Sequence, residues 1–216
     1  MELSEALRTT GSSRDFTDQP VDDVTVAAVL DDARFAPSGG NRQPWKVAVV
    51  SNMSIRRRLA DLMTDVWYEY LGEGADPSRA PFAFGRSTGA SPVSAPNPLL
   101  DKIENVPVVL AVAANFNSIA LMDGNLDRPP ITGGASVYPF CWSILLAARA
   151  RGLGGVMTTF LSRAEAQAAS VLGLPTDHAL AATIFLGYPM HLNTKLRRGQ
   201  VSAFTTIDRF DGEPLI

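Results

Sequence analysis

Residues 37–45 read Pro-Ser-Gly-Gly-Asn-Arg-Gln-Pro-Trp, and no other stretch of the chain is as informative. It follows a segment with helical spacing of apolar residues and precedes an apolar run that begins at Trp45. Its two glycines allow the backbone to approach a flat ligand closely. Ser38 and Asn41 offer hydrogen bonds, and a turn that only reversed the chain would not need so many polar groups. We therefore expect this turn to belong to a binding site.

Helices and short apolar strands alternate outward from this turn. Helical spacing predicts helices over residues 22–35, 54–71, 134–151 and 162–172. Apolar runs predict strands over residues 45–50, 107–114, 155–159 and 181–187. Ser162 and Glu165 have the spacing of a capping box, and the run from Arg56 to Arg58 is interpreted as a solvated face. The pattern predicts a mixed α and β protein.

Length and composition exclude several classes of protein. The 216 residues, 46% of them apolar, are enough for one well-packed domain. The net charge is 19 − 22 = −3, without the basic excess expected of a nucleic-acid-binding protein. The longest apolar stretch, residues 106–114, is far shorter than the ~20 residues of a membrane helix. The charged fraction of 19% is below the usual ~25% and suggests buried surface beyond one monomer.

A single cysteine, Cys141, excludes an intrachain disulfide and fits a reducing compartment. The first residues have acidic side chains where a signal peptide has a basic stretch followed by an apolar one. We therefore expect a cytoplasmic protein with neither membrane nor nucleic acid as partner.

The side chains that usually carry catalysis are not arranged for it. His178 and His191 have no ligand partners at metal-binding spacing, so no metal site is expected. No serine lies in a G-x-S-x-G turn, and Cys141 is expected to be a packed core thiol. If the chain is an enzyme, a cofactor carries the chemistry.

Three further stretches are polar or glycine-rich beyond the needs of packing. Residues 9–16 combine hydroxyls with Arg14 and suit a phosphate, although a helix-capping loop has the same composition. Residues 133–159 begin with two glycines and end in a strand with Thr158 and Thr159, which could face the edge of a ring. Residues 195–198 are basic and suit either an anion or a solvated tail.

Residues 72–98, rich in proline and glycine, are expected to form a loop too long to be a simple connection.

In this order and at these separations, the four stretches resemble the FMN-dependent nitroreductase family. That family has an R-x-S-x-R-x-F segment, a P-S-x-x-N-x-Q-P-W turn, a G-L-G-x-x-x-T-T segment and a G-Y-P … K-x-R segment. The match covers roughly residues 8–50 and 131–201. It does not extend to residues 52–104.

The resemblance implies an α+β fold: a central mixed or antiparallel sheet flanked by helices, a long central helix at a dimer interface, and a C-terminal tail that reaches the partner. Residues 1–216 would form a single domain with a variable lid at about residues 72–98. The protein would be a homodimer with two FMN molecules, each bound at the interface.

The resemblance also implies a role for individual residues. Ser12 and Arg14 match positions that hold the FMN phosphate, joined by Lys195 and Arg197. The turn that reaches the flavin, from the partner subunit, matches Pro37, Ser38, Gly39 and Asn41. Thr158 and Thr159 match the segment beside N5 and O4 of the flavin, and Phe82 and Phe84 would belong to the substrate lid.

Thr10 also matches a cofactor-binding position, but the family usually has a basic residue there and often another at the position of Gly11. The phosphate site would then depend more on Arg14, Lys195 and Arg197.

The activity that the resemblance implies is an NAD(P)H-dependent oxidoreductase with ping-pong kinetics. It would pass electrons through flavin N5 to a nitroaromatic, a quinone or a similar flat acceptor. The same fold serves reductive dehalogenation of the iodotyrosine type and oxygen-dependent flavin destruction in cobalamin synthesis. A protein that binds or stores FMN without turnover is a third reading, supported by the uncharged Thr10 and Gly11.

Overall fold

Four antiparallel strands form the sheet of the protein, in the order β1-β2-β4-β3. In the computed structural model, which describes residues 1–74, 80–83, 90–192 and 195–215, they span Trp45–Val49 (β1), Val108–Asn115 (β2), Gly154–Thr158 (β3) and His178–Gly187 (β4). The two inner strands, β2 and β4, are buried along most of their length, because apolar residues occupy both of their faces. Every pair of neighbouring strands is antiparallel, so the sheet is antiparallel rather than mixed. The α+β fold is confirmed.

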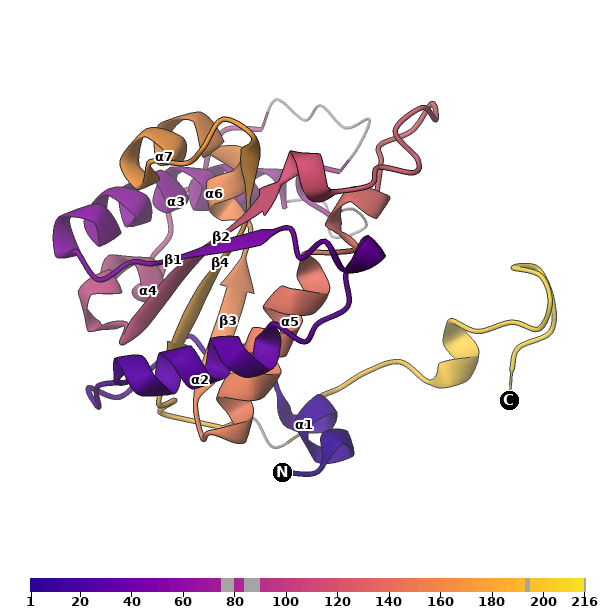
Figure 1. The fold of residues 1–216 in the computed structure, drawn as a ribbon, viewed down its shortest axis with the longest axis horizontal. Helices are drawn as coiled ribbons and strands as arrows, with labels where there is room; N and C mark the ends of the chain where they lie inside the picture. Colours follow the sequence, from indigo (N-terminus) through magenta and orange to yellow (C-terminus); the bar gives the residue numbers. More distant parts are fainter. Residues whose placement is uncertain (75–79, 84–89, 193–194, 216) are drawn as a thin grey trace.

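Helices cover both faces of this sheet (Figure 1). On one face lie α2 (Asp23–Ala33) and α5 (Tyr138–Ala150), against alternate residues of β2 such as Leu110 and Val112. On the other lie α3 (Met53–Glu73), α6 (Phe160–Arg163) and α7 (Glu165–Leu172), against the intervening residues such as Val109. Alternate residues of a strand point to opposite faces, so a fully apolar strand needs two helical layers.

Shorter elements complete the fold. Leu3–Thr9 form α1 and Pro98–Asp101 form α4. Single turns of 3₁₀ helix lie at Gly39–Asn41, Ile103–Asn105, Phe116–Ser118, Thr132–Gly134 and Val201–Ala203. No helix in the described part of the chain is long and apolar enough to cross a membrane.

Two of the predicted helices begin at other residues. The helix expected over 134–151 begins at Tyr138, because residues 132–134 form a 3₁₀ turn. The predicted capping box is wrong, since α6 ends at Arg163 and Ala164 precedes α7. Ser162 instead donates to the carbonyl of Leu180 at 2.6 Å, and the carboxylate of Glu165 accepts from the N–H of Leu180 at 2.6 Å. The two side chains thus attach these helices to β4.

The interpretation of Arg56 as solvated is also wrong. Its side chain is buried and donates to the carbonyls of Val50, Val106 and Pro107 at 2.7, 2.6 and 3.2 Å. Burial without a counter-ion lowers its pKa. Arg56 therefore ties α3 to the chain segments at the ends of two strands, whereas Arg57 and Arg58 are exposed as expected.

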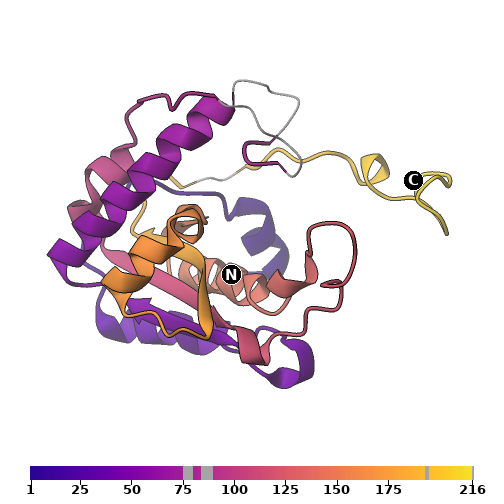
Figure 2. The same ribbon diagram turned by 90° about the horizontal axis from the view of Figure 1, so that it is seen from above.

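The C-terminal tail leaves the body of the protein. It starts beside residues 15–17, where the N–H of Met190 donates to Asp15 and the N–H of Thr17 donates to Tyr188. Beyond residue 200 the tail extends away from the helices and the sheet in both views (Figures 1 and 2). Its apolar side chains, Phe204 and Phe210 among them, are exposed.

Candidate functional site

The segment from Thr10 to Arg14 lies along β3. Ser12 forms a parallel bridge with Gly155, and the N–H of Ser13 donates to the Gly155 carbonyl at 2.9 Å. A Cβ at Gly154 would lie 2.6 Å from Oγ of Ser13, closer than such atoms approach. Glycine at position 154 therefore allows this segment to pack directly against the strand. Two hollows open next to it.

The larger hollow, here called the aromatic pocket, has a volume of about 460 Å³. This is within the range of small-molecule sites. It lies between the C-terminal part of α3, the chain around α4, and the residues that follow β3. Its lining consists of Arg14, Trp67, Tyr70, Pro96, Asn97, Pro98, Leu99, Leu100, Met157, Thr158, Thr159 and Phe160.

Three rings form one wall of the aromatic pocket. Trp67 and Tyr70 are one helical turn apart on α3, with ring centroids 5.9 Å from each other. Phe160 lies 6.1 Å from Trp67 and 6.0 Å from Tyr70. The indole N–H of Trp67 donates to the carbonyl of Ala95 at 3.2 Å, which fixes the orientation of that ring. Such a wall suits a flat aromatic ligand.

One of the two predicted lid residues lies next to this wall. The ring of Phe82 is 6.3 Å from that of Tyr70, and the guanidinium of Arg163 lies over its face at 4.4 Å. The backbone N–H of Phe82 donates to the carboxylate of Glu73 at 2.9 Å. The other residue, Phe84, lies outside the described residues.

The smaller hollow, here called the Arg149 gap, has a volume of only about 10 Å³, roughly enough for one water molecule. Arg149 of α5 reaches it and donates to the hydroxyl of Thr9 at 3.2 Å. Thr10 also lines the gap, but its hydroxyl donates to the carbonyl of Ala6 at 2.7 Å. The lining consists of Thr9, Thr10, Gly11, Ser13, Leu145, Arg149, Leu153, Gly154, Gly155 and Leu192.

The turn at residues 37–45 is built for an unusual backbone path. Gly40, Asn41 and Gln43 all have positive φ, at 60°, 53° and 48°. The N–H of Gly39 donates to Oγ of Ser136 at 3.0 Å, and Oγ of Ser38 accepts from the N–H of Gln43 at 3.0 Å. These bonds hold an exposed loop in one shape.

The end of the turn is fixed to α5, since Trp45 stacks on Phe140 with the ring centroids 4.5 Å apart. Among the described residues, neither the aromatic pocket nor the Arg149 gap is lined by residues 37–41. The structure therefore brings Arg14 together with Thr158 and Thr159, but does not bring the turn to them within one chain.

The basic residues of the tail are exposed. Lys195 follows Leu192, which lines the Arg149 gap, by three residues, a reach of at most about 11 Å for an extended chain. Arg197 is exposed two residues further on. Lys195 is thus attached within reach of the gap, whereas neither cation is part of its lining.

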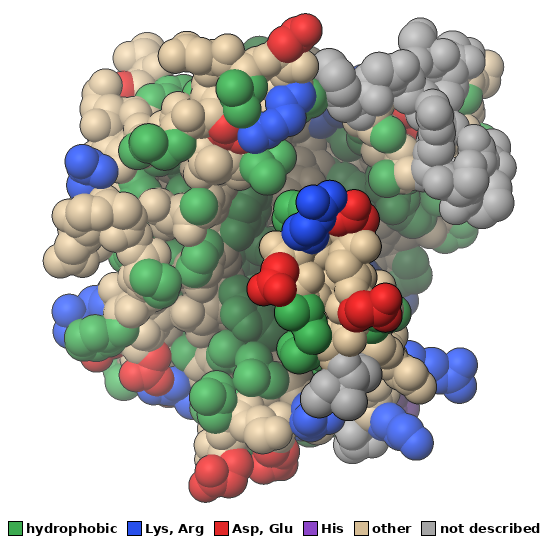
Figure 3. All heavy atoms as spheres, turned by 90° about the vertical axis from the view of Figure 1, so that its right-hand side faces the viewer, with side chains coloured by type: hydrophobic (Ala, Val, Ile, Leu, Met, Phe, Trp, Pro, Cys, Tyr) green, Lys and Arg blue, Asp and Glu red, His purple; other side chains and the backbone are tan. Residues whose placement is uncertain are grey.

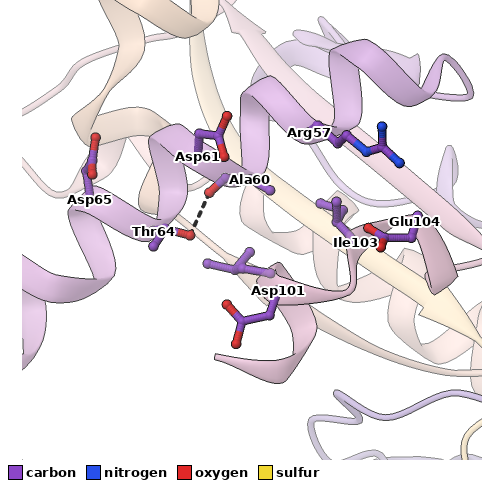
Figure 4. A pocket seen from close by; sticks show the side chains of 9 residues that line it. Arg57, Ala60, Asp61, Thr64, Asp65, Asp101, Ile103 and Glu104 are labelled. Carbon is purple, nitrogen blue, oxygen red and sulfur yellow. Dashed lines mark hydrogen bonds between the residues drawn. The ribbon is translucent and has the colours of Figure 1, made fainter. Parts of the chain in front are cut away.

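The charged groups of a third hollow are mainly carboxylates, whereas the charged group of the Arg149 gap is a cation. It has a volume of about 530 Å³ and lies between α3 and the α4 region, with Asp61, Asp65, Asp101 and Glu104 in its wall (Figure 4). None of the predicted site residues lines it. Within the described parts of the chain, no group of His, Cys, Asp or Glu is arranged to hold a metal ion. The aromatic pocket and the Arg149 gap, which are lined by the predicted site residues Arg14, Thr158, Thr159 and Thr10, are therefore the candidate site.

Unsatisfied polar atoms fit a ligand that spans these two hollows. In the described part of the chain, three buried side-chain polar atoms have no hydrogen-bond partner: Nε of Arg149, Oγ1 of Thr158 and Oγ1 of Thr183. Two of the three belong to residues that line the Arg149 gap and the aromatic pocket. A buried polar atom without a partner costs about 1–3 kcal/mol. A flat ring in the pocket with an anionic group beside Arg149 would supply the missing partners.

Sequence reasoning did not identify Arg149, Trp67, Tyr70 or Phe160 as site residues. Arg149 looks like a cation in the last turn of a helix, where it suits the helix dipole. Trp67 and Tyr70 fit the apolar spacing of α3. Phe160 could have been found, because it directly follows the threonine pair in the chain.

Known proteins resemble the chain over most of its length. The sequence matches the Nitroreductase family over residues 7–188. It is 29% identical to a 5,6-dimethylbenzimidazole synthase of Rhodospirillum rubrum, over 82% of this chain and 76% of that protein. It is 26% identical to a nitrobenzene nitroreductase of Ectopseudomonas oleovorans, over 86% of each chain. The solved structure of the NADPH:FMN oxidoreductase from Vibrio harveyi, complexed with NAD+, has the same fold, with a TM-score of 0.69 and 18% identity over 98% of this chain and 79% of that one.

Proposed function

Because the chain belongs to the nitroreductase family, we propose that it is an FMN-dependent oxidoreductase that uses NAD(P)H to reduce flat aromatic acceptors. The observation that carries this proposal is the pair of unsatisfied buried atoms at Arg149 and Thr158, in the two hollows next to segment 10–14. A ligand with a ring at one end and a phosphate at the other matches both hollows.

The ring end of the ligand would lie at the aromatic pocket. Thr158 and Thr159 would then offer hydrogen bonds to the polar edge of the flavin, as the family resemblance implies. Arg14 lines the same pocket, so we propose that its guanidinium reaches the ring end, in place of the phosphate contact that the resemblance implies for it. Trp67, Tyr70 and Phe160 would exclude water from the space above the ring and leave room for a flat acceptor.

The phosphate end would lie near Ser12, with Lys195 and Arg197 brought in from the tail. A phosphate monoester has a charge of about −1.5 to −2 at pH 7 and is held best by more than one cation. Thr10 can contribute by shape and as an acceptor, because its hydroxyl proton already binds Ala6.

When bound, FMN would supply the redox chemistry at N5, so no protein side chain needs to act as an acid, a base or a nucleophile. The protein binds, orients and shields. Donor and acceptor would occupy the same open space in turn, which gives ping-pong kinetics. Phe82, beside Tyr70, would limit the size of the acceptor.

A second copy of the chain would complete the site. The turn at residues 37–41 is exposed and preorganised but lines neither hollow, which suits a role across a dimer interface. Figure 3 shows hydrophobic side chains gathered in a hollow on the face from which the tail extends. The exposed apolar residues Phe204 and Phe210 of the tail would be covered by the partner.

The test is a visible spectrum of the purified protein supplied with FMN, followed by anaerobic titration with NADH and NADPH. We expect a bound flavin spectrum that bleaches with at least one of the two donors and recovers on addition of a nitroaromatic or a quinone. A bound flavin that neither donor bleaches would refute the oxidoreductase proposal. Turnover no faster than that of free FMN would leave the storage role as the better account.

Similarity to 5,6-dimethylbenzimidazole synthase, at 29% identity, favours flavin destruction as a second candidate function. In that case aerobic incubation with reduced FMN would consume the flavin and release the benzimidazole. The product is identified by mass spectrometry, with nitroaromatics and halotyrosines tested in parallel. Recovery of all the FMN after many turnovers would exclude this candidate.

A further inference from the structure

Arg149 is a partly buried cation with no anionic partner in the described structure. One guanidinium nitrogen donates to the hydroxyl of Thr9 at 3.2 Å, while Nε is buried without a partner. None of the ion pairs among the described residues involves Arg149. Its neighbour Arg151 differs, since it pairs with Asp32 at 2.7 Å and donates to the carbonyl of Ala147. A buried N–H without an acceptor costs about 1–3 kcal/mol, so we expect Nε of Arg149 to have an acceptor, and a guanidinium binds an anionic acceptor best.

The surroundings of Arg149 suit an anion. Within the described residues, the Arg149 gap is lined by hydroxyls, glycines and apolar side chains, with no carboxylate and no second cation. Gly11 has no side chain, and the hydroxyl proton of Thr10 is directed to Ala6. The guanidinium is thus the one charged group at this place, and an anion there would meet no like charge.

The size of the gap limits what can enter. With room for about one water molecule, it admits a single oxygen atom but not a whole phosphate group. The rest of such a ligand would have to lie outside the gap, alongside segment 10–14. Segment 10–14 lines the gap with Thr10 and the aromatic pocket with Arg14.

We propose that Arg149 binds a phosphate oxygen of the flavin nucleotide and thereby makes the protein select FMN over riboflavin. This inference rests on the proposed function, because it assumes that the flavin ring lies at the aromatic pocket. Arg149 would supply a fixed charge from the body of the protein, whereas Lys195 and Arg197 supply charges from the tail. The competing explanation is a structural one, in which Arg149 only stabilises the C-terminal end of α5 through the helix dipole.

The experiment compares the affinities of the apoprotein for FMN and for riboflavin, measured by quenching of flavin fluorescence. The variants are R149Q and, as the matched control two residues along the same helix end, R151Q. We expect R149Q to weaken FMN binding roughly 10- to 100-fold, as for the loss of a hydrogen bond to a charged group, and to change riboflavin binding less than twofold. R151Q is expected to leave both affinities as in the wild type.

The other outcomes distinguish the alternatives. Equal weakening of FMN and riboflavin by R149Q would assign Arg149 a structural role and overturn the inference, as would no change in either. If the wild type binds riboflavin and FMN equally, no phosphate is recognised and the inference also fails. A wild type that binds neither flavin contradicts the proposed function itself.

A second variant tests the gap without altering Arg149. Thr10 lines the gap and is only partly buried, so T10E would bring a carboxylate to the rim of the gap, near the guanidinium, without filling it. The new carboxylate would occupy the cation, and we expect FMN binding to weaken at least tenfold while riboflavin binding stays unchanged. An unaltered preference for FMN in T10E would overturn the inference even if R149Q failed to fold.

Discussion

The aromatic pocket and the Arg149 gap differ in almost every physical property, although both adjoin one five-residue segment. The pocket holds about 460 Å³ and is walled by large aromatic rings from α3 and α6 and by proline and leucine residues of the chain around α4. The gap holds about 10 Å³ and is formed by backbone, glycines and hydroxyls around one guanidinium. The difference suggests a division of labour, in which the gap recognises a fixed chemical group and the pocket accommodates exchangeable flat molecules.

The largest effect is expected at Gly154, because segment 10–14, which lines both the pocket and the gap, packs against this residue. G154A places a Cβ 2.6 Å from Oγ of Ser13 and 3.0 Å from Pro189. Segment 10–14 must then move away from β3, and overpacking of this kind costs about 1–3 kcal/mol. We expect a melting temperature lower by several degrees and weaker binding of both FMN and riboflavin. The control is G199A, where a Cβ has no neighbour within 4 Å; wild-type stability in G154A would contradict the close packing.

Arg14 decides whether the two regions are chemically distinct. Because Arg14 lines the aromatic pocket, R14A should weaken FMN and riboflavin by similar factors, corresponding to about 1.5 kcal/mol. The measurement is the same pair of dissociation constants used for R149Q. Weaker binding of FMN alone would instead place Arg14 at the phosphate, as the family resemblance implies, and would mean that the aromatic pocket and the Arg149 gap bind the same part of the ligand.

Thr158 gives a smaller and more local test. Its hydroxyl is buried without a partner within the protein, so T158V should raise the free energy of unfolding of the apoprotein by up to about 1–3 kcal/mol and weaken flavin binding by about 0.5–1.5 kcal/mol. T183V is a matched control, because Thr183 pairs with Thr158 across β3 and β4, also lacks a partner and does not line the pocket. Equal effects of the two substitutions on flavin binding would show that the pocket is not where the ring lies.

The smallest effect on flavin binding is expected from Cys141, a buried residue of α5. Burial raises the pKa of the Cys141 thiol to about 12. Above pH ~8.5 the unfolded chain therefore loses a proton that the folded chain retains, and stability should fall as the pH rises towards 12. At pH 8 we expect no alkylation of the native protein, unchanged flavin binding, and rapid alkylation once urea is added. Alkylation of the folded protein at the rate of a free thiol would contradict this burial.

Local signals predicted the framework around the two regions. The apolar runs located the four strands, since each strand is short and most are buried on at least one face. Asp22 caps α2 with a 2.7 Å bond to the N–H of Thr25, and Gly152 follows α5 with the positive φ expected beyond a helix end. The turn at residues 37–45 could be predicted from the sequence, because it contains more glycine and polar residues than a turn that only reverses the chain requires.

Tertiary contacts decided what the sequence could not predict. Two of the three carbonyls that bind Arg56 come from a segment about 50 residues away. Ser162 and Glu165 bind the backbone of β4 instead of capping a helix. Arg149 meets Thr9, 140 residues earlier in the chain. In each case one polar side chain has two locally reasonable roles, and only the packed structure selects between them.

The position of segment 10–14 has a consequence for solubility as well. β3 is the last strand of the sheet, and an uncovered outer strand offers its unpaired N–H and carbonyl groups to other chains. At Gly155, where Ser12 forms a parallel bridge, the N–H of Ser13 occupies the carbonyl. Segment 10–14 thus covers this outer strand at one residue, and a ligand that keeps the segment in place would also keep that part of the edge closed to other chains.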